Sequence, residues 1–349
     1  MKRPWVNLLL LVLLSIQAVT GYLGFTNGRE TAAWILVLHG IIAYGLVLLL
    51  FLKATIIGDA WWRKKRWTGR RAGFVIVLVL LGLTLLSGLL WTFQGPLYLG
   101  GFSLVSLHIY IAVPLMLLMF WHAWHMRFIR RVPGATGRRL FLSGLATALG
   151  GLALWAAVGR AKAAAGLTGA ARRFTGSYET GSFTPDFPVV SWIADRPPLV
   201  DMTVWRLRVE GAVERRLSLS YDELVALAQG EAVAALDCTG GWYSVQRWRG
   251  VSVGDLLARA GVQPTAASVT FEAVSGYRRR FPLAEAAAAL LALGTADESG
   301  AAYRSLSHGH GAPVRLVLPG RRGMEWVKWV AVIRVNEGGA LWQSPLPLQ

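Results

Sequence analysis

The sequence predicts two parts, an N-terminal bundle of membrane-spanning helices and a following α+β domain. The bundle is expected to hold four spans plus a fifth anchor or signal helix. Residues 1 to about 160 are dominated by long apolar runs, whereas residues 170–349 have the mixed composition of a soluble domain. Hydrophobic residues make up 54% of the 349 residues, and the formal net charge is +17. The second part is long enough to bury a core of its own.

Four apolar stretches reach the length of about 20 residues that a helix needs to cross a bilayer. They cover residues 5–25, 32–54, 73–93 and 103–125, and a fifth, weaker stretch covers 140–158. Tryptophans lie where several of these stretches meet polar sequence, as aromatic belts at membrane interfaces do. They are Trp5, Trp34, Trp61, Trp62, Trp91, Trp121 and Trp124. We therefore expect a multi-pass protein embedded in a lipid bilayer.

Basic residues predict the orientation of the spans. They gather in the loop after the second span (Arg63, Lys64, Lys65, Arg66, Arg70 and Arg71) and in the loop after the fourth (Arg127, Arg130, Arg131, Arg138 and Arg139). The positive-inside rule places both loops in the cytoplasm. We expect a bacterial inner-membrane protein with a cytoplasmic N-terminus and a periplasmic, extracytoplasmic C-terminal domain. Because topology accounts for much of the charge, we expect no nucleic-acid partner.

The fifth stretch opens with an arginine pair, Arg138-Arg139, followed by Leu140-Phe141-Leu142. The pair fits either two more positive-inside arginines or a twin-arginine signal, which exports folded proteins. The Leu-Phe-Leu sequence and the mild apolar run after it favour the export signal. Ala161-Lys162-Ala163 fits a signal-peptidase site, but we expect the fifth helix to remain as an anchor.

Two histidines lie inside predicted spans, where ionisable residues are functional candidates by default. From the outer face, His39 lies roughly 12 Å into the second span and His108 roughly 8 Å into the fourth, at ~1.5 Å per residue. Two neutral imidazoles at similar depth on neighbouring helices are what a six-coordinate haem iron needs. The alternative is a histidine pair that only hydrogen-bonds to the backbone or to each other.

His122 lies close to four helical turns beyond His108 on the same side of the fourth span. This placement, over residues 1 to about 126, resembles the two-haem ladder of membrane-embedded b-type cytochromes. The inner end of the second span offers Lys53 in place of a histidine. We therefore expect one haem b between His39 and His108, and we keep His122 as a ligand of a second haem only as an alternative.

Beyond residue 170, strand-like and helix-like segments alternate, which predicts a mixed α+β domain. Segments 221–228 and 253–260 have acidic residues in the first turn and are predicted as short helices. An alanine-rich helix is predicted over 283–293. The predicted strands, from their apolar patterns, are 204–209, 232–236, 269–274, 314–318 and 326–335.

Cys238 is the only cysteine of the chain. It lies where a predicted strand meets a Gly-Gly turn flanked by aromatic residues, in Asp237-Cys238-Thr239-Gly240-Gly241-Trp242-Tyr243. A thiolate held at a strand end by a tight turn suits a metal ligand or a nucleophile. The alternative is a small buried apolar residue, which is the common role of a lone cysteine.

Four segments carry a family resemblance. They are Phe174-Thr175-Gly176-Ser177 with Phe187-Pro188 and Asp195; Cys238-Thr239-Gly240-Gly241-Trp242 with Trp248-Arg249-Gly250-Val251; Gly276-Tyr277 before Phe281-Pro282-Leu283; and His310-Gly311-Ala312-Pro313-Val314-Arg315 up to Pro319-Gly320, with Lys328-Trp329 and Ile333. In this order, over about 160 residues, they resemble the molybdopterin-binding domain of the sulfite oxidase family.

The resemblance implies that Cys238 is the thiolate ligand of molybdenum, with the dithiolene sulfurs supplied by molybdopterin. It implies that His310, Arg315 and Lys328 hold the pterin phosphate, with Arg321 and Arg322 as further options. Phe174, Thr175, Gly240 and Gly241 are the other cofactor-binding residues that it implies. We expect Thr239, Trp242 and Tyr243 to shape the substrate pocket beside Cys238.

Two departures from the family bear on the substrate. Sulfite oxidases place arginines in and near the cysteine loop, whereas residues 239–242 contain none. The bacterial periplasmic members that reduce protein methionine sulfoxide have a carboxylate just after the cysteine, where this chain has Thr239 and Gly240. The chain also lacks the tyrosine that we would expect before Gly323.

The predicted function is a membrane-bound molybdenum oxidoreductase that transfers an oxygen atom and exchanges electrons with the quinone pool through haem b. The absence of sulfite-type arginines favours reduction of S-oxides, either small sulfur compounds or protein methionine sulfoxide. The alternatives are a sulfite-type oxidase, a non-catalytic binding or sensing module, and an electron-transfer cytochrome with a docking domain. The predicted domains are 1–126 (four spans with haem b), 127–170 (basic loop, twin-arginine-like signal and fifth span) and 171–349 (extracytoplasmic oxidoreductase domain).

Overall fold

The chain divides into two compact units, Met1–Tyr178 and Glu179–Gln349. The computed structural model describes residues 4–63, 69–125, 137–191, 195, 197–341 and 343–344. Several of the basic residues that predict the membrane orientation lie outside the described residues, namely Lys64, Lys65, Arg66, Arg127, Arg130 and Arg131.

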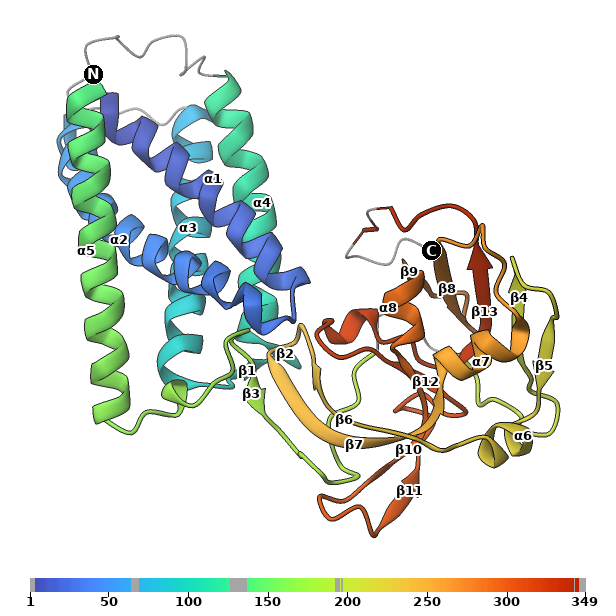
Figure 1. The fold of residues 1–349 in the computed structure, drawn as a ribbon. Coiled ribbons are helices and arrows are strands. Elements are labelled where there is room, and N and C mark those ends of the chain that lie inside the picture. Colours follow the sequence, from blue (N-terminus) through green and yellow to red (C-terminus); the bar gives the residue numbers. More distant parts are fainter. Residues whose placement is uncertain are drawn as a thin grey trace. The chain divides into compact units, whose positions relative to one another are not determined.

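The first unit consists of five long helices, α1 (Pro4–Thr26), α2 (Ala33–Arg63), α3 (Gly69–Gln94), α4 (Leu104–His125) and α5 (Gly137–Ala164) (Figure 1). Each carries a stretch long and apolar enough to cross a membrane. This confirms a helical N-terminal half suited to a membrane, while the separate status of the fifth helix stays a prediction. Shorter elements join the helices: η1 (Glu30–Ala32), the hairpin β1 (Tyr98–Leu99) and β2 (Phe102–Ser103), and η4 (Thr168–Ala170).

Helix α5 packs tightly against α2 through glycines. A Cβ atom added at Gly151 would lie 2.5 Å from the carbonyl oxygen of Ile41, so only glycine permits this approach of the two backbones. Close contact through small residues is a common way for helices to associate in lipid. Near the other end of α5, Lys162 is buried and donates to the carbonyl oxygen of Thr92 on α3. Both contacts support the expectation that the fifth helix is retained as an anchor.

The second unit contains two sheets. The first has the order β11-β10-β7-β3, with β6 paired to β7 and β12 paired to β10, and the second has the order β5-β4-β13-β8-β9. The strands are β3 (Tyr178–Glu179), β4 (Leu207–Gly211), β5 (Leu217–Leu219), β6 (Gly230–Asp237), β7 (Trp242–Ser252), β8 (Ser268–Ala273), β9 (Arg278–Pro282), β10 (Leu290–Ala296), β11 (Tyr303–Ser305), β12 (Arg315–Val317) and β13 (Val330–Asn336). The helices are α6 (Tyr221–Ala226), α7 (Val253–Ala260), α8 (Leu283–Ala287) and η5 (Gly323–Glu325). The predicted α+β class is confirmed.

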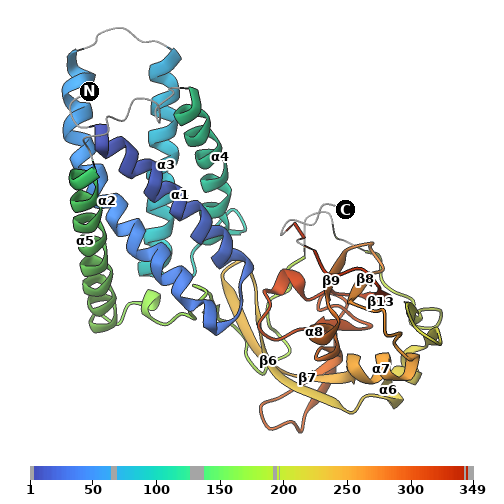
Figure 2. The same cartoon turned by 45° about the horizontal axis from the view of Figure 1, so that its top comes forward.

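Strands β6 and β7 form a long hairpin (Figure 2). Cys238 lies in the turn between them. Its pairing runs from Gly230 opposite Gly250 to Asp237 opposite Tyr243. Along β7 the side chains alternate between buried and half-buried, which is the two-residue period of a strand with one face on the core. The hairpin therefore presents the turn after Asp237 at a fixed place beside the core.

The predicted helix over 283–293 is wrong beyond Ala287. Helix α8 ends there, and Leu290–Ala296 forms strand β10, in which every residue is buried. Strand β10 pairs with β7, β11 and β12 in the middle of the first sheet. Burial and pairing on both sides therefore override the helix propensity of its alanines and leucines.

Candidate molybdopterin site

Cys238 lies in the turn that joins β6 to β7. Its N–H donates to the carbonyl oxygen of Trp242, and its own carbonyl oxygen accepts from the N–H of Gly241, which has a φ of +90°. Glycine adopts that φ without strain. The N–H of Gly240 points at the thiol, with 3.3 Å between the nitrogen and Sγ. The Gly-Gly sequence therefore turns the chain and supplies a backbone donor to the sulfur.

A buried ion pair fixes this turn. Arg322 donates through Nη1 to Oδ1 of Asp237 at 2.7 Å, and their side chains are only 4% and 3% exposed. Its Nη2 donates to the carbonyl oxygen of Cys238 at 3.1 Å. A Cβ atom added at Gly323 would lie 3.4 Å from the Cα of Cys238, so the backbone after Arg322 packs directly on the cysteine. Arg322 therefore holds the cysteine turn and is not free for a phosphate.

Two further cations lie near the sulfur without an ion-pair partner among the described residues. Arg315 is 2% exposed, and its one hydrogen bond goes from Nη1 to the carbonyl oxygen of His310 at 3.0 Å. Its Nε is buried and makes no hydrogen bond. Lys328 donates to three neutral acceptors, the carbonyl oxygens of Val190 and Gly309 and the hydroxyl of Ser191. Among the described residues, the hydrogen bonds of both cations go to neutral groups, while the carboxylate of Asp195 acts on Lys328 from a longer distance and raises its pKa.

Burial shifts the pKa values of these groups. It lowers the pKa of Arg315 to about 10. Burial and then the nearby charge of Arg315 lower the pKa of Lys328 to about 7. Burial also raises the pKa of the Cys238 thiol, while the Gly240 N–H and the Arg322 charge act in the opposite direction. A thiolate at Cys238 would raise the pKa of both Arg315 and Lys328, which shows that the sulfur and the two cations share one electrostatic site.

Aromatic rings and a histidine enclose the two cations. The guanidinium of Arg315 lies over the ring of Trp248 at 5.3 Å and near that of Trp326 at 6.0 Å. His310 stacks on Phe187, with ring centroids 3.9 Å apart, and its Nε2 binds the carbonyl oxygen of Phe187. The structure thus brings together residues about 120 positions apart in the sequence.

Comparison with known proteins agrees with this geometry. Residues 194–340 match the family described as oxidoreductase molybdopterin binding domain. An uncharacterized oxidoreductase of Bacillus subtilis, YuiH, is 30% identical over 155 residues, which are 44% of this chain and 76% of that protein. This chain belongs to the molybdopterin-binding oxidoreductase family. The predicted class of enzyme is thereby confirmed.

Two other relatives in the family carry names that state a reaction. The catalytic subunit MsrP of a protein-methionine-sulfoxide reductase from Xanthomonas axonopodis pv. citri is 31% identical over 152 residues, or 39% of this chain and 46% of that protein. The mitochondrial sulfite oxidase of Rattus norvegicus is 33% identical over 180 residues, or 42% of this chain and 32% of that protein. The chain spans about half of the first relative and about a third of the second.

The residues present fit the cofactor of the family. A molybdopterin phosphate needs cations and N–H donors, and the buried Nε of Arg315 is a donor without an acceptor. A polar group left unpaired in a protein interior costs roughly 1–3 kcal/mol. Gly311 makes room beside it, because a Cβ atom there would lie 3.1 Å from the Cβ atoms of both Arg315 and Lys328. The predicted trio His310, Arg315 and Lys328 therefore lies together.

Other predicted site residues lie in different surroundings. Thr239, Gly240 and Tyr243 are half-buried around the cysteine, whereas Trp242 is buried in the core. Phe174 and Thr175 belong to the first unit, where Phe174 lies under the guanidinium of Arg173.

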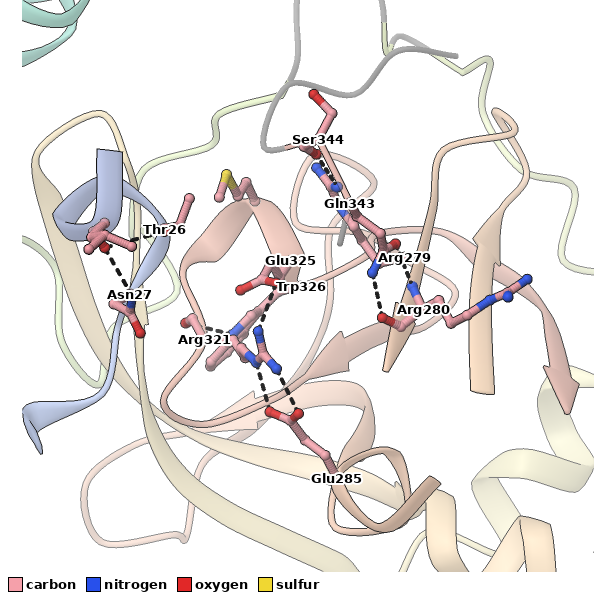
Figure 3. A network of polar contacts seen from close by, with 12 residues as sticks. Thr26, Asn27, Arg279, Arg280, Glu285, Arg321, Glu325, Trp326, Gln343 and Ser344 are labelled. Carbon is pink, nitrogen blue, oxygen red and sulfur yellow. Dashed lines mark hydrogen bonds and ion pairs between the residues drawn. The ribbon is translucent and has the colours of Figure 1, made fainter. Parts of the chain in front are cut away.

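Arg321 is not available for a phosphate either. It forms a two-pronged ion pair with Glu285 and a further one with Glu325 (Figure 3). Burial raises the pKa of Glu325, against the charge of Arg321. Sequence reasoning therefore missed that Arg321 and Arg322 pair with carboxylates of this chain. For the ion pair of Arg322, the one sequence feature that could have indicated it is Asp237, the acidic residue directly before Cys238.

The first unit brings His39 and His108 together. Their ring centroids are 6.3 Å apart and the rings are inclined by 78°. Two imidazoles that bind one metal ion from opposite sides, each with a nitrogen ~2 Å from the metal, have centroids about 6 Å apart. The spacing therefore fits a shared six-coordinate metal.

The hydrogen bonds of both rings use Nδ1. In His108, Nδ1 lies 2.8 Å from the carbonyl oxygen of Thr84, which only accepts, so Nδ1 carries the proton. In His39, Nδ1 lies 3.0 Å from Oγ1 of Thr20, whose own hydrogen is donated to the carbonyl of Ile16. Each ring then has Nε2 unprotonated, which is the metal-binding form of a neutral histidine. His122 is exposed on α4, and Lys53 donates to Asn7.

We predict that Arg322→Met destabilises the second unit by about 3–5 kcal/mol, because it leaves the carboxylate of Asp237 buried without its cation. Arg334→Met is the matched control. Arg334 pairs with Glu210 but is 48% exposed, and such pairs contribute about 0–1 kcal/mol. Denaturant unfolding of the two variants and the wild type measures the difference. Equal effects of the two substitutions would contradict the role given to Arg322.

The lowered pKa of Lys328 predicts a pH dependence in cofactor-free protein. With a folded pKa of about 7 against an ordinary value of about 10.4, the unfolded state binds more protons between these values, so stability rises with pH above about 7. Lys328→Met should flatten this rise. The thermal unfolding temperature between about pH 6 and pH 9 measures it in both proteins, and identical slopes would refute the assignment.

Proposed function

We propose that this protein is a membrane-bound molybdenum oxidoreductase that reduces S-oxides by oxygen-atom transfer at a molybdopterin centre bound through Cys238. The observation that carries the proposal is a buried guanidinium, Arg315, and a half-buried lysine, Lys328, which form no ion pair among the described residues and lie near the only cysteine of the chain. Cys238 would bind the molybdenum, and Arg315, Lys328 and His310 would hold the pterin phosphate. When bound, the cofactor supplies a metal that exchanges one oxygen atom and two electrons with a substrate.

The residues of this chain supply positioning and exclusion of water. Arg322 and Asp237 hold the backbone of the turn at the cysteine in place. Trp248 and Trp326 are 0% and 2% exposed, and they separate Arg315 from solvent. A charge–phosphate contact is stronger where water is excluded. Thr239 and Tyr243, half-buried next to the sulfur, are the side chains proposed to contact the substrate.

An S-oxide fits the turn better than sulfite does. Residues 239–242 contain no cation, and Arg322 is already paired with Asp237. An anionic substrate would need a free cation beside the cysteine, whereas a neutral sulfoxide needs none. The MsrP relative is named for methionine sulfoxide. A sulfite-type oxidase is the second candidate, because a relative of similar identity is named sulfite oxidase.

We propose further that His39 and His108 hold one haem b. The support is the 6.3 Å spacing of the rings and the Nδ1 hydrogen bonds that leave both Nε2 atoms for iron. Glycines give the rings space: Cβ atoms at Gly21 and Gly88 would lie 3.2 Å from His39 and His108, respectively. His122 is proposed as a ligand only if a second haem is present.

The proposed electron source is quinol in the bilayer. Residues 1–178 contain 19 lysines and arginines and 2 acidic residues, while residues 179–349 contain 17 of each. The whole net charge therefore belongs to the membrane part, as expected for an N-terminus and basic loops in the cytoplasm of a bacterial inner membrane. The second unit is neutral, so it gives no electrostatic reason for a nucleic-acid partner. In the reaction, quinol gives two electrons and two protons, the sulfur–oxygen bond breaks, and the oxygen leaves as water.

The test is to reduce the detergent-solubilised protein with quinol and add methionine sulfoxide or sulfite while recording the haem spectrum. We expect methionine sulfoxide to reoxidise the haem. Cys238→Ser should abolish this reoxidation and leave reduction by quinol intact. Replacing His108 by Gln should remove the haem, and the matched variant His122→Gln should keep it. A haem that responds only to sulfite would contradict the S-oxide proposal.

A further inference from the structure

Trp91 and Tyr178 form a buried aromatic pair in the first unit, and the polar group of each side chain makes a hydrogen bond to a backbone carbonyl oxygen. Each is 4% exposed, and their ring centroids lie 5.2 Å apart in an edge-to-face arrangement. The hydroxyl of Tyr178 donates to the carbonyl oxygen of Trp91 at 2.8 Å. The indole N–H of Trp91 donates to the carbonyl oxygen of Gly176 at 2.9 Å. The segment before Glu179 is thereby fastened to helix α3.

One end of this pair leads to His108. Trp91 lies one helical turn, about 4.5 Å, beyond Gly88 on α3. A Cβ atom at Gly88 would lie 3.2 Å from the ring of His108. The Nδ1 of His108 also lies 2.8 Å from the carbonyl oxygen of Thr84 and 3.4 Å from the hydroxyl of Ser87. Helix α3 therefore connects the imidazole of His108, which contacts residues 84, 87 and 88, with Trp91 one turn further along.

The other end leads to Cys238 along the chain. The residue after Glu179, Thr180, donates its N–H to the carbonyl oxygen of Tyr243 at 2.9 Å. The neighbour of Tyr243, Trp242, accepts from the N–H of Cys238 at 2.9 Å. Each of these contacts lies inside one unit, and the two halves join through the peptide bond between Tyr178 and Glu179.

We propose that Trp91, Tyr178 and the backbone of residues 178–180 carry single electrons between the His39–His108 pair and Cys238. This rests on the proposed function, in which haem iron and molybdenum occupy those two positions. With both groups bound, each electron lost by the iron would be gained by the molybdenum, and two such transfers would be needed for each S-oxide reduced. The rings themselves are not oxidised; their close contact shortens the gaps across which an electron tunnels, and the protons travel separately.

A purely structural role makes a different prediction. The carbonyl oxygen of Trp91 is one of the last four of α3, which lack partners within the helix. Tyr178 therefore also caps α3, and a capping role alone would change stability without changing the rate of electron transfer. The two roles are separated by measuring both quantities in the same variants.

The experiment follows haem reoxidation by stopped-flow after quinol-reduced full-length protein is mixed with methionine sulfoxide. We expect Trp91→Leu and Tyr178→Leu to slow reoxidation severalfold, and Trp91→Phe, which keeps a ring, to restore part of the rate. Trp124→Leu, at an 86% exposed tryptophan of α4, is the matched control and should leave the rate unchanged. We expect no change in the contents of haem and molybdenum or in the haem midpoint potential. The rate of S-oxide reduction should also stay the same when a reduced viologen supplies electrons directly to the second unit.

A second measurement, amide hydrogen exchange, needs no cofactor and is made alongside the haem reoxidation rate. Hydrogen exchange at the amides of Gly176 and Thr180 should speed up in Trp91→Leu, because the segment loses its bond to α3. An unchanged reoxidation rate in Trp91→Leu and Tyr178→Leu, with both metals present, overturns this inference alone. A wild-type protein without haem or without molybdenum overturns the inference together with the proposed function.

Discussion

The guanidinium of Arg315 is a positive charge buried in the second unit with a single hydrogen bond from Nη1 and no ion pair among the described residues. A buried charge is costly unless it is paired and hydrogen-bonded. The surrounding side chains relieve this cost only in part, because the rings of Trp248 and Trp326 attract the guanidinium through cation–π contacts but carry no negative charge, and Lys328 is a second cation. This arrangement suits an anionic ligand, and the proposed occupant is the phosphate of a molybdopterin whose metal Cys238 would bind.

The four cations of this region divide into two kinds. Arg321 and Arg322 are paired with Glu285 and Asp237, so their charges are balanced within the chain. Arg315 and Lys328 are not balanced in this way. Arg321 and Arg322 fix the backbone around Cys238 and η5, whereas Arg315 and Lys328 remain for the ligand. The turn at the cysteine therefore offers no free cation of its own to an anionic substrate, and the two cations near the sulfur, Arg315 and Lys328, are assigned to the pterin phosphate.

Much of this arrangement is predictable from sequence, and the exceptions have physical causes. The family resemblance implies the trio His310, Arg315 and Lys328, and the depth of His39 and His108 predicts that their rings meet. The ion pair of Arg322 with Asp237 joins positions 85 residues apart, and nothing local distinguishes it from a phosphate ligand. The helix predicted over 283–293 fails because the sheet contacts of β10, absent from local sequence, decide its conformation.

Two centres are proposed in this chain, a thiolate site in the second unit and a histidine pair among the helices of the first. The most direct test is the content of molybdenum and haem iron per chain in the purified, detergent-solubilised protein, by elemental analysis and reduced-minus-oxidised spectra. The account predicts one molybdenum and one haem. Haem without molybdenum, after expression in a host supplied with molybdenum, would contradict it, and molybdenum without haem would leave His39 and His108 as packing residues.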